Sequence, residues 1–183
     1  NSVSPEQSMQ LTDCVCNPGY HGANGDTCTA CVAKTFCSGG TTAPQNCPSP
    51  FSSSAVASTS SSACICQAGY YGPNGGDCTL CPVGSFCPGG TTVTSCGGTT
   101  AGMYSPPGSS TLSQCVCDVG YYFNSYWNED GLNTECTQCP RGYFKDSVGN
   151  ALCTICPADT YQSNLGSTSP SSCEPCPLFT TTG

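Results

Sequence analysis

The stretch CVCNPGYHGANGDTCTAC at residues 14–31 returns 50 residues later as CICQAGYYGPNGGDCTLC at residues 64–81. The cysteines, the glycines and an aromatic residue recur together at the same spacing, which identifies an internal repeat. A third copy starts as CVCDVGYY at Cys115 and reaches its next CxxC pair after a longer loop. Two shorter units follow, CPRGYFKDSVGNALCTIC from Cys139 and CPADTYQSNLGSTSPSSCEPC from Cys156. The repeat therefore indicates an array of small cysteine-rich modules.

The composition restricts both the fold and the cell compartment. The 183 residues include 20 cysteines, and only 8% of the residues are charged. Cysteine at this density marks a disulfide scaffold, which needs an oxidising compartment outside the cell or in a secretory lumen. Three basic residues stand against 11 acidic ones, so a basic surface for nucleic acid is missing. We therefore expect an extracellular or secreted protein with no nucleic-acid partner, and no membrane span because no apolar run is long enough.

The array is expected to contain very little helix. Gly, Pro, Ser, Thr and Asn dominate the loops, and no stretch keeps a helical period. The predicted fold class is small disulfide-rich repeats in an elongated linear array of short β-ribbons and loops, with almost no helix. The Asn24–Gly25 and Asn74–Gly75 pairs predict tight turns between strands. Tyr20, Tyr70 and Tyr121 are expected to stack on disulfides as small local cores.

The spacing of the cysteines divides the chain into seven segments. They are an N-terminal arm (1–13), repeat 1 (14–63), repeat 2 (64–114), the start of a third repeat with an aromatic and acidic insert (115–138), two short modules (139–155 and 156–175), and a half module (176–183) that residues 1–14 of the next unit complete. Large aliphatic residues are scarce, so each module is expected to contact mainly its neighbours.

Sterics narrow the pairing of the cysteines, which a sequence does not normally fix. If each cysteine bonds to a neighbour along the chain, one phase joins the CxC and CxxC pairs in tight, strained rings. The other phase makes every loop comfortable and predicts nine bonds: Cys16–Cys28, Cys31–Cys37, Cys47–Cys64, Cys66–Cys78, Cys81–Cys87, Cys96–Cys115, Cys117–Cys136, Cys139–Cys153 and Cys156–Cys173. A crossed pattern inside each repeat is the alternative.

The comfortable phase leaves one cysteine near each end of the chain, Cys14 and Cys176. The tail CPLFTTTG followed by the head NSVSPEQSMQLTDC resembles the internal segment CGGTTAGMYSPPGSSTLSQC in length and Ser/Thr content. We therefore predict that Cys176 of one unit bonds to Cys14 of the next, between separate chains or between periods of a longer tandem polypeptide. The alternative is a Cys14–Cys176 bond that closes a single chain into a ring.

The segments CNPGYHG, CQAGYYG, CPVGSFCPGG and CPRGYFKDSVGNALCTIC resemble the ephrin-receptor-like cysteine-rich repeats. Their CPxGxY units look like the A-type modules of tumour-necrosis-factor receptors. The segment CVCNPGYHGANGDTC is similar to the last loop of an epidermal-growth-factor module, and the third repeat start at 115–138 is EGF-like in the same sense. The resemblance implies an extracellular modular architecture. Such repeats are common in algal and protist surface proteins, including flagellar hairs, which implies a structural role.

Features that carry chemistry in other proteins have plainer explanations here. The CxxC pairs lack the histidine partners of a zinc site and the helix start of a redox motif. His21 is the only histidine, and its counterpart in the next repeat is Tyr71, so it reads as a surface variant of an aromatic position. Residues 128–131 with Glu135 offer oxygen ligands for calcium, but a solvated loop explains them. We expect no catalytic, metal or cofactor site and no enzyme activity.

The insert of the third repeat carries the most aromatic stretch of the chain. An exposed aromatic patch usually marks a contact surface, whereas a packed local core is the alternative. The candidate contact patch consists of Tyr122, Phe123, Tyr126 and Trp127.

Loops rich in serine, threonine and proline predict O-linked glycans. No Asn-x-Ser/Thr sequon occurs, while residues 49–62 read SPFSSSAVASTSSS and resemble a mucin-like substrate. Ser-Pro pairs such as Ser105–Pro106 resemble the motifs of plant and algal wall proteins in which proline is hydroxylated and glycosylated. The candidate positions are Ser52, Ser53, Ser54, Ser58, Thr59, Ser60, Pro106 and Pro107. Plain soluble loops are the alternative.

These features predict a structural subunit of an extracellular glycosylated filament that assembles head to tail. Its expected partners are further copies of itself, as a homopolymer, and O-linked glycans. The alternative is a ligand-binding or adhesive ectodomain fragment of a cell-surface receptor-like protein. The complementary ends favour the filament, because a receptor fragment does not need ends that complete each other.

Overall fold

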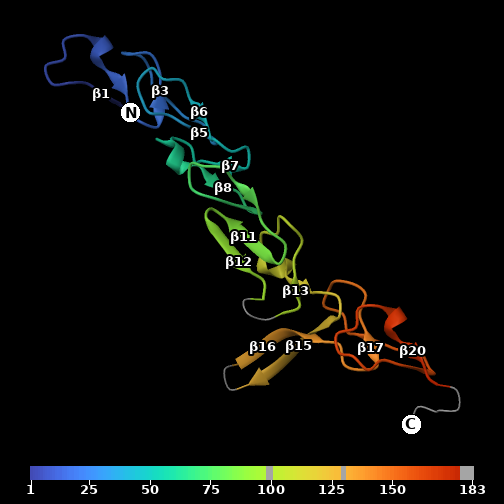
Figure 1. Cartoon of the computed structure of the whole chain (residues 1–183). Coiled ribbons are helices and arrows are strands. Elements are labelled where there is room, and N and C mark those ends of the chain that lie inside the picture. The colour runs from blue at the N-terminus through green and yellow to red at the C-terminus, as the bar shows by residue number, and fades with distance from the viewer. Residues whose placement is uncertain (98–100, 129–130, 178–183) are drawn as a thin grey trace. The chain divides into compact units, whose positions relative to one another are not determined.

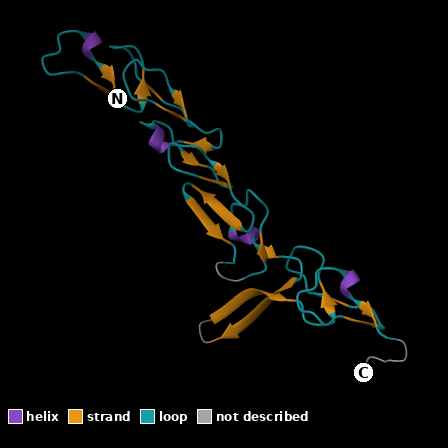
Figure 2. Ribbon diagram, viewed as in Figure 1, coloured by secondary structure: helices purple, strands orange, loops and turns teal. Residues whose placement is uncertain are grey.

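The computed structural model describes residues 1–97, 101–128 and 131–177, and for residues 126–128 and 131–134 only the backbone is described. Within that part of the chain, the secondary structure consists of ten two-stranded β-ribbons and four single 3-10 turns (Figure 2). Each ribbon pairs two strands that follow one another in the sequence. We number the ribbons 1 to 10 in chain order. The predicted short ribbons with almost no helix are confirmed.

The strands of the ten ribbons are labelled in Figure 1 where there is room. Ribbons 1 to 5 pair β1 (Ser2–Val3) with β2 (Val15–Cys16), β3 (Tyr20–His21) with β4 (Thr29–Ala30), β5 (Thr35–Phe36) with β6 (Gln45–Asn46), β7 (Ser52–Ser53) with β8 (Ile65–Cys66), and β9 (Tyr70–Tyr71) with β10 (Thr79–Leu80). Ribbons 6 to 10 pair β11 (Ser85–Gly89) with β12 (Thr92–Ser95), β13 (Met103–Tyr104) with β14 (Val116–Cys117), β15 (Tyr121–Asn128) with β16 (Gly131–Gln138), β17 (Tyr143–Phe144) with β18 (Thr154–Ile155), and β19 (Thr160–Tyr161) with β20 (Glu174–Pro175).

The four 3-10 turns recur in ribbons 1, 4, 7 and 10, each just before the second strand. They are η1 (Leu11–Asp13), η2 (Ser61–Ala63), η3 (Leu112–Gln114) and η4 (Pro170–Ser172). The chain forms two compact units, the first made of Asn1–Cys81 with Cys87–Val93 and the second of Pro82–Phe86 with Thr94–Gly183. The boundary falls within ribbon 6. The seven-segment division of the sequence and the elongation of the array stay predictions.

Most ribbons close through one backbone hydrogen bond at a turn residue with positive φ. The N–H of Cys31 donates to the carbonyl of Gly19 (φ 89°) at 2.9 Å, and the N–H of Cys156 donates to Gly142 (φ 81°) at 2.8 Å. Glycine before an aromatic residue in the repeat therefore supplies a left-handed turn that other residues adopt at a cost. Lys34 and Asp159 occupy the same position at φ values of 68° and 61°.

The core consists of disulfides and not of aromatic rings. Twelve of the thirteen buried hydrophobic residues in the described part of the chain are cysteines, and the other is Phe144. Tyr20, Tyr70 and Tyr121 are half-buried and are not among these core residues, and their expected stacking on disulfides stays a prediction. Tyr70 stacks on the ring of Phe51, with the centroids 4.2 Å apart and the planes 8° from parallel. Stability must therefore come mainly from covalent cross-links.

The N-terminal segment 1–13 is a folded part of ribbon 1 and not an extended arm. Ser2 pairs with Cys16 and Val3 with Val15 in an antiparallel register. Ribbon 4 has the same arrangement 50 residues later, where Ser52 pairs with Cys66. The strand partner of this segment is therefore β2 of its own chain, and not a strand of a neighbouring unit.

Both Asn-Gly pairs form turns, as the sequence predicts, and each turn packs on the preceding ribbon. Gly25 (φ 78°) donates its N–H to the carbonyl of Cys14 at 2.8 Å, and an added Cβ would lie 2.8 Å from the carbonyl oxygen of Leu11. Gly40 also has a positive φ, 66°, but an added Cβ there would meet no atom within 4 Å. Substitutions at these two glycines therefore separate the energetic cost of a positive φ from that of a steric clash.

Alanine at Gly25 is expected to destabilise the fold more than alanine at Gly40. Both substitutions place a Cβ in the left-handed region, at about 1–2 kcal/mol. Gly25→Ala adds a clash with the backbone before Cys14, for roughly 1–3 kcal/mol more. Guanidinium unfolding with the disulfides intact measures both free energies of unfolding. Equal losses in the two variants would contradict the packing of this turn on η1.

Candidate functional site: the ribbon joints and the unpaired cysteines

Nine disulfides join the ten ribbons in chain order. In each of them, the cysteine that ends one ribbon meets a cysteine of the next ribbon, at Cα–Cα distances of 5.4–6.1 Å. The pairs are Cys16–Cys28, Cys31–Cys37, Cys47–Cys64, Cys66–Cys78, Cys81–Cys87, Cys96–Cys115, Cys117–Cys136, Cys139–Cys153 and Cys156–Cys173. The structure brings together every pair that the sequence spacing predicts, so CxC and CxxC motifs link successive joints.

Backbone hydrogen bonds accompany the disulfide at the joint between ribbons 3 and 4. The N–H of Lys34 donates to the carbonyl of Ser54 at 3.2 Å, and the N–H of Cys37 donates to the carbonyl of Ser58 at 3.0 Å. In the reverse direction, the N–H of Ala57 donates to the carbonyl of Cys31 at 2.8 Å. The joint buries these groups, since Ser54 is 6% exposed, Ser58 is 8% exposed and Cys31 is fully buried.

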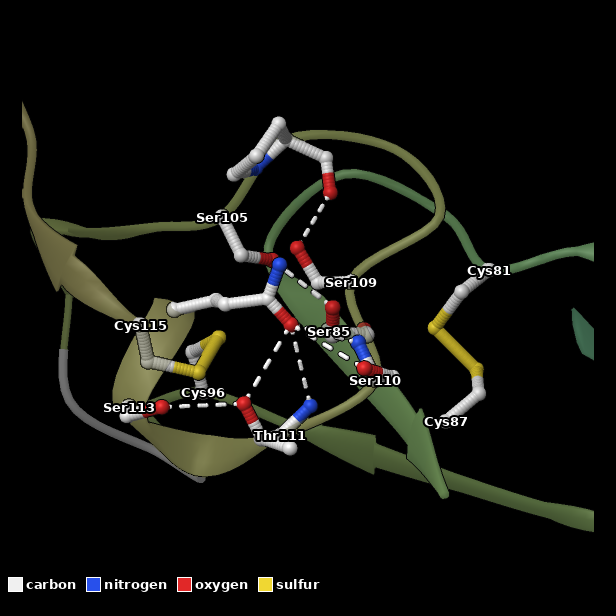
Figure 3. The surroundings of a disulfide bond; sticks show 12 residues. Cys81, Ser85, Cys87, Cys96, Ser105, Ser109, Ser110, Thr111, Ser113 and Cys115 are labelled. Carbon is white, nitrogen blue, oxygen red and sulfur yellow. Dashed lines mark hydrogen bonds between the residues drawn. A yellow bond between two sulfur atoms is a disulfide. The ribbon is translucent and has the colours of Figure 1, made fainter. Parts of the chain in front are cut away.

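The joint between ribbons 9 and 10 repeats the same three bonds at equivalent positions. Gly142 donates to Gln162, Gly166 donates to Cys139, and Lys145 donates to Ser167, each from N–H to carbonyl at 2.9 Å. At the joint between ribbons 6 and 7, Gly84 donates to Ser105 at 3.1 Å. The hydroxyl of Ser105 donates to the carbonyl of Ser85 at 2.7 Å, beside the Cys96–Cys115 disulfide (Figure 3). The joints between ribbons 3 and 4 and between ribbons 9 and 10 therefore share the same three backbone hydrogen bonds, and the joint between ribbons 6 and 7 has the first of them.

The two unpaired cysteines occupy the two halves of such a joint. The N–H of Cys176 donates to the carbonyl of Asp159 at 2.9 Å, as that of Cys47 does to Lys34, so Cys176 ends ribbon 10. The N–H of Cys14 donates to Leu11 at 3.0 Å and follows η1, as Cys64 follows η2. Both cysteines are half-buried and neither forms a disulfide. We call the cysteine that ends a ribbon outgoing, and the cysteine of the next ribbon to which it bonds incoming. Ribbon 1 therefore carries an incoming cysteine without a disulfide partner, and ribbon 10 carries an outgoing one.

Three of the predicted glycan positions are inaccessible. Ser52, Ser54 and Ser58 are 2%, 6% and 8% exposed. Their hydroxyls donate to the carbonyls of Ser49, Thr35 and Ala55 at 2.7–2.8 Å. The structure removes these three serines from the candidate set, because a bulky sugar would break the joint. Thr59, Ser60, Pro106 and Pro107 are exposed, and Ser53 is half-buried.

The predicted contact patch lies on ribbon 8, and half of it is described. Tyr122 and Phe123 of β15 are half-buried. For Tyr126 and Trp127 the structure describes only the backbone, which pairs with Asn133 and Leu132. Part of the acidic cluster, at residues 129–130, lies outside the described residues. Tyr122 also lines a shallow apolar cleft of about 190 Å³ together with Pro140, Tyr143, Leu152 and Cys153.

Sequence reasoning missed Lys145, which is only 3% exposed. It stands six residues after Cys139, where the earlier repeats place Cys37 and Cys87. Its ammonium donates to the carbonyls of Gly149 at 2.7 Å and Asp118 at 3.2 Å. Burial lowers the pKa of Lys145 from its ordinary value of 10.5, and the negative charge of Asp118 offsets part of this by raising it. The unfolded chain thus holds this proton to higher pH, so the free energy of unfolding should rise as pH increases through the folded pKa toward 10.5.

Replacing Lys145 by methionine is expected to destabilise ribbon 9. The apolar stem is largely retained, but two carbonyls lose their hydrogen-bond donor, which costs about 1–3 kcal/mol. Lys34→Met is the matched control, because Lys34 is exposed and makes its joint bond through the backbone. Guanidinium unfolding of the oxidised protein measures both. A Lys145→Met variant as stable as the control would show that the ammonium is not needed.

No group of three or more His, Cys, Asp or Glu residues within residues 1–97, 101–128 and 131–177 could hold a metal ion. His21 lies in β3 opposite Thr29. Over the same residues, no helix is long and apolar enough to cross a membrane.

Ten ribbons joined by disulfides define the class of this molecule: it is a cysteine-rich repeat protein of the extracellular modular type. Residues 120–173, which include ribbons 8 and 9 and the first strand of ribbon 10, match the tyrosine-protein kinase ephrin type A/B receptor-like family. The predicted resemblance to ephrin-receptor-like repeats is thus confirmed. The chain is also 34% identical over 160 residues to cysteine repeat modular protein A of Toxoplasma gondii, an alignment that covers 82% of the chain and 3% of that relative. It therefore spans a small fraction of this relative's length.

Proposed function

We propose that the protein is a structural module of an extracellular filament in which Cys176 of one unit bonds to Cys14 of the next. One observation carries the proposal: nine disulfides join ten ribbons, and the two remaining cysteines stand at the positions that a tenth joint would use. A head-to-tail contact between unlike surfaces generates an open helical polymer unless its rotation happens to close. The chain acts as a covalently joined spacer that bears load, without enzyme activity.

The alternative function is a ligand-binding or adhesive ectodomain. The cleft beside Tyr122 favours it, because it is apolar and lies in the segment that matches the receptor-like family. That function needs no bond between Cys176 and Cys14. Assembly of the purified protein therefore decides between the two proposals.

The test is peptide mapping of native material without reduction, combined with electron microscopy. The filament proposal expects a cross-linked peptide pair that contains Cys14 and Cys176, and particles that lengthen with concentration under oxidising conditions. Mixing units labelled with heavy and light isotopes shows whether the pair joins two chains. A pair found only within one chain, or two free thiols in native material, would contradict the filament.

Glycans are proposed only on the exposed positions of the predicted set, Thr59, Ser60, Pro106 and Pro107. The preceding residues Ser58 and Ser105 are buried in the joints, whereas these four residues are exposed. We expect an intact mass above the 18.6 kDa of the bare chain, with sugar on peptides that carry these positions. A native chain at the bare mass would end this proposal, and sugar on Ser54 would contradict the joint geometry.

A further inference from the structure

Ribbon 1 exposes the acceptor half of a joint. Ser4, Gln7 and Ser8 occupy the positions that Ser54, Ala57 and Ser58 hold in ribbon 4, 50 residues later. Ser54 and Ser58 are buried, whereas Ser4 and Ser8 are exposed. Among the described residues, no hydrogen bond involves the carbonyls of Ser4 and Ser8 or the N–H of Gln7. The local backbone is nevertheless in place, since Gln7 has a φ of 66° and Ala57 a φ of 61°.

Ribbon 10 carries the opposite half, in which Asp159 is exposed, Cys156 is half-buried and Gln162 is 8% exposed. Cys156, Asp159 and Gln162 repeat the spacing of Cys139, Gly142 and Lys145, whose backbone groups bind ribbon 10 itself. No hydrogen bond to another described residue uses the carbonyl of Cys156 or the N–H groups of Asp159 and Gln162. Cys156 is half-buried, while Cys139 is fully buried. Ribbon 10 thus presents one acceptor and two donors in the order of the internal joints.

From this complementarity we infer that a second copy of the chain docks ribbon 1 on ribbon 10 through a backbone seam in one register. The N–H of Asp159 donates to the carbonyl of Ser4, the N–H of Gln7 donates to the carbonyl of Cys156, and the N–H of Gln162 donates to the carbonyl of Ser8. The inference rests on the proposed head-to-tail filament, and it names the surface that aligns the two thiols.

The register follows from the internal joints and needs no change of backbone. On ribbon 10, Cys156, Asp159 and Gln162 have the same spacing as Cys31, Lys34 and Cys37. On ribbon 1, Ser4, Gln7 and Ser8 have the same spacing as Ser54, Ala57 and Ser58. Buried backbone groups are nearly always paired, so a copy that covers Ser8 must satisfy its carbonyl. A shift by one residue would leave these donors and acceptors unpaired, which favours a single register over sliding contacts.

The test separates the seam from the covalent bond. The double variant Cys14→Ser/Cys176→Ser cannot form the inter-unit disulfide, so its association reports the seam alone. In that background, Ser8→Trp places an indole on the joint face. Thr12→Trp is the matched control, because Thr12 and its equivalents Ser62 and Ser113 are all exposed. Sedimentation velocity over a concentration series measures association of the double variant and of each tryptophan variant.

We expect the double variant to associate reversibly, Ser8→Trp to weaken that association by about 100-fold or more, and Thr12→Trp to change it by less than about threefold. A photo-crosslinker at position 8 of the double variant should mark residues 156–162 of another copy. Equal effects of both tryptophans, or a crosslink to ribbon 1 of the second copy, would overturn the register. A monomeric double variant beside a polymerising wild type would overturn the seam alone, whereas a monomeric wild type would refute the filament itself.

Discussion

Chains with serine at Cys14 are expected to stop at monomers or disulfide dimers where the wild type gives a ladder on non-reducing gels. Cys14 and Cys176 are the two cysteines without a disulfide, so Cys14→Ser leaves one thiol per chain and ends propagation. Cys176→Ser should act in the same way. Both variants should keep the nine internal disulfides and the thermal stability of the wild type, because neither cysteine takes part in those bonds.

An equimolar mixture of Cys14→Ser and Cys176→Ser gives the sharpest form of this experiment. One variant keeps only the outgoing thiol of ribbon 10, and the other keeps only the incoming thiol of ribbon 1. A head-to-tail bond therefore predicts a heterodimer that grows no further, resolved from homodimers by isotope labelling. Homodimers in the statistical ratio would indicate unspecific oxidation of exposed thiols, and an unchanged ladder in both variants would show that other residues join the units.

The disulfide pairing and the class of fold could be read from the sequence because both depend on spacing. A cysteine-rich repeat with CxC and CxxC links allows one comfortable sequential pairing, and the structure places the same cysteines together. The outgoing and incoming roles of Cys176 and Cys14 followed from that pairing by parity. The spacing of the cysteines does not show which strands pair, however, so the pairing of Ser2–Val3 with Val15–Cys16 of the same chain was not predicted.

Burial of polar residues was the other feature that composition concealed. Serine-rich stretches are typical of exposed loops, but a chain with few aliphatic residues fills its joints with small hydroxyl side chains. Ser105 is fully buried and bonds to the carbonyl of Ser85, and Ser54 bonds in the same way to Thr35. Their recurrence at equivalent repeat positions was the available signal. Lys145 could have been found similarly, because it replaces a repeat cysteine.

Reduction of the nine disulfides is expected to unfold the whole chain without added denaturant. The buried hydrophobic residues of the described chain are cysteines apart from Phe144, so reduction removes the cross-links and leaves no aliphatic core. Cross-links over separations of 6 to 19 residues stabilise a fold by about 2–4 kcal/mol each. Nine of them exceed the about 5–15 kcal/mol by which small domains are usually stable.

The measurement uses the Cys14→Ser/Cys176→Ser variant, which keeps 18 of the 20 cysteines. With every remaining cysteine in a disulfide, alkylation without reductant should add no group, and alkylation after reduction should add 18. Proton NMR should then lose its chemical-shift dispersion, and the hydrodynamic radius should rise toward that of an unfolded chain. Dispersed spectra from the fully alkylated chain would show that the backbone joints hold without the disulfides. Because the joints between ribbons 3 and 4 and between ribbons 9 and 10 combine a disulfide with only three backbone hydrogen bonds, we expect neither ribbons nor joints to survive once the cross-links are gone.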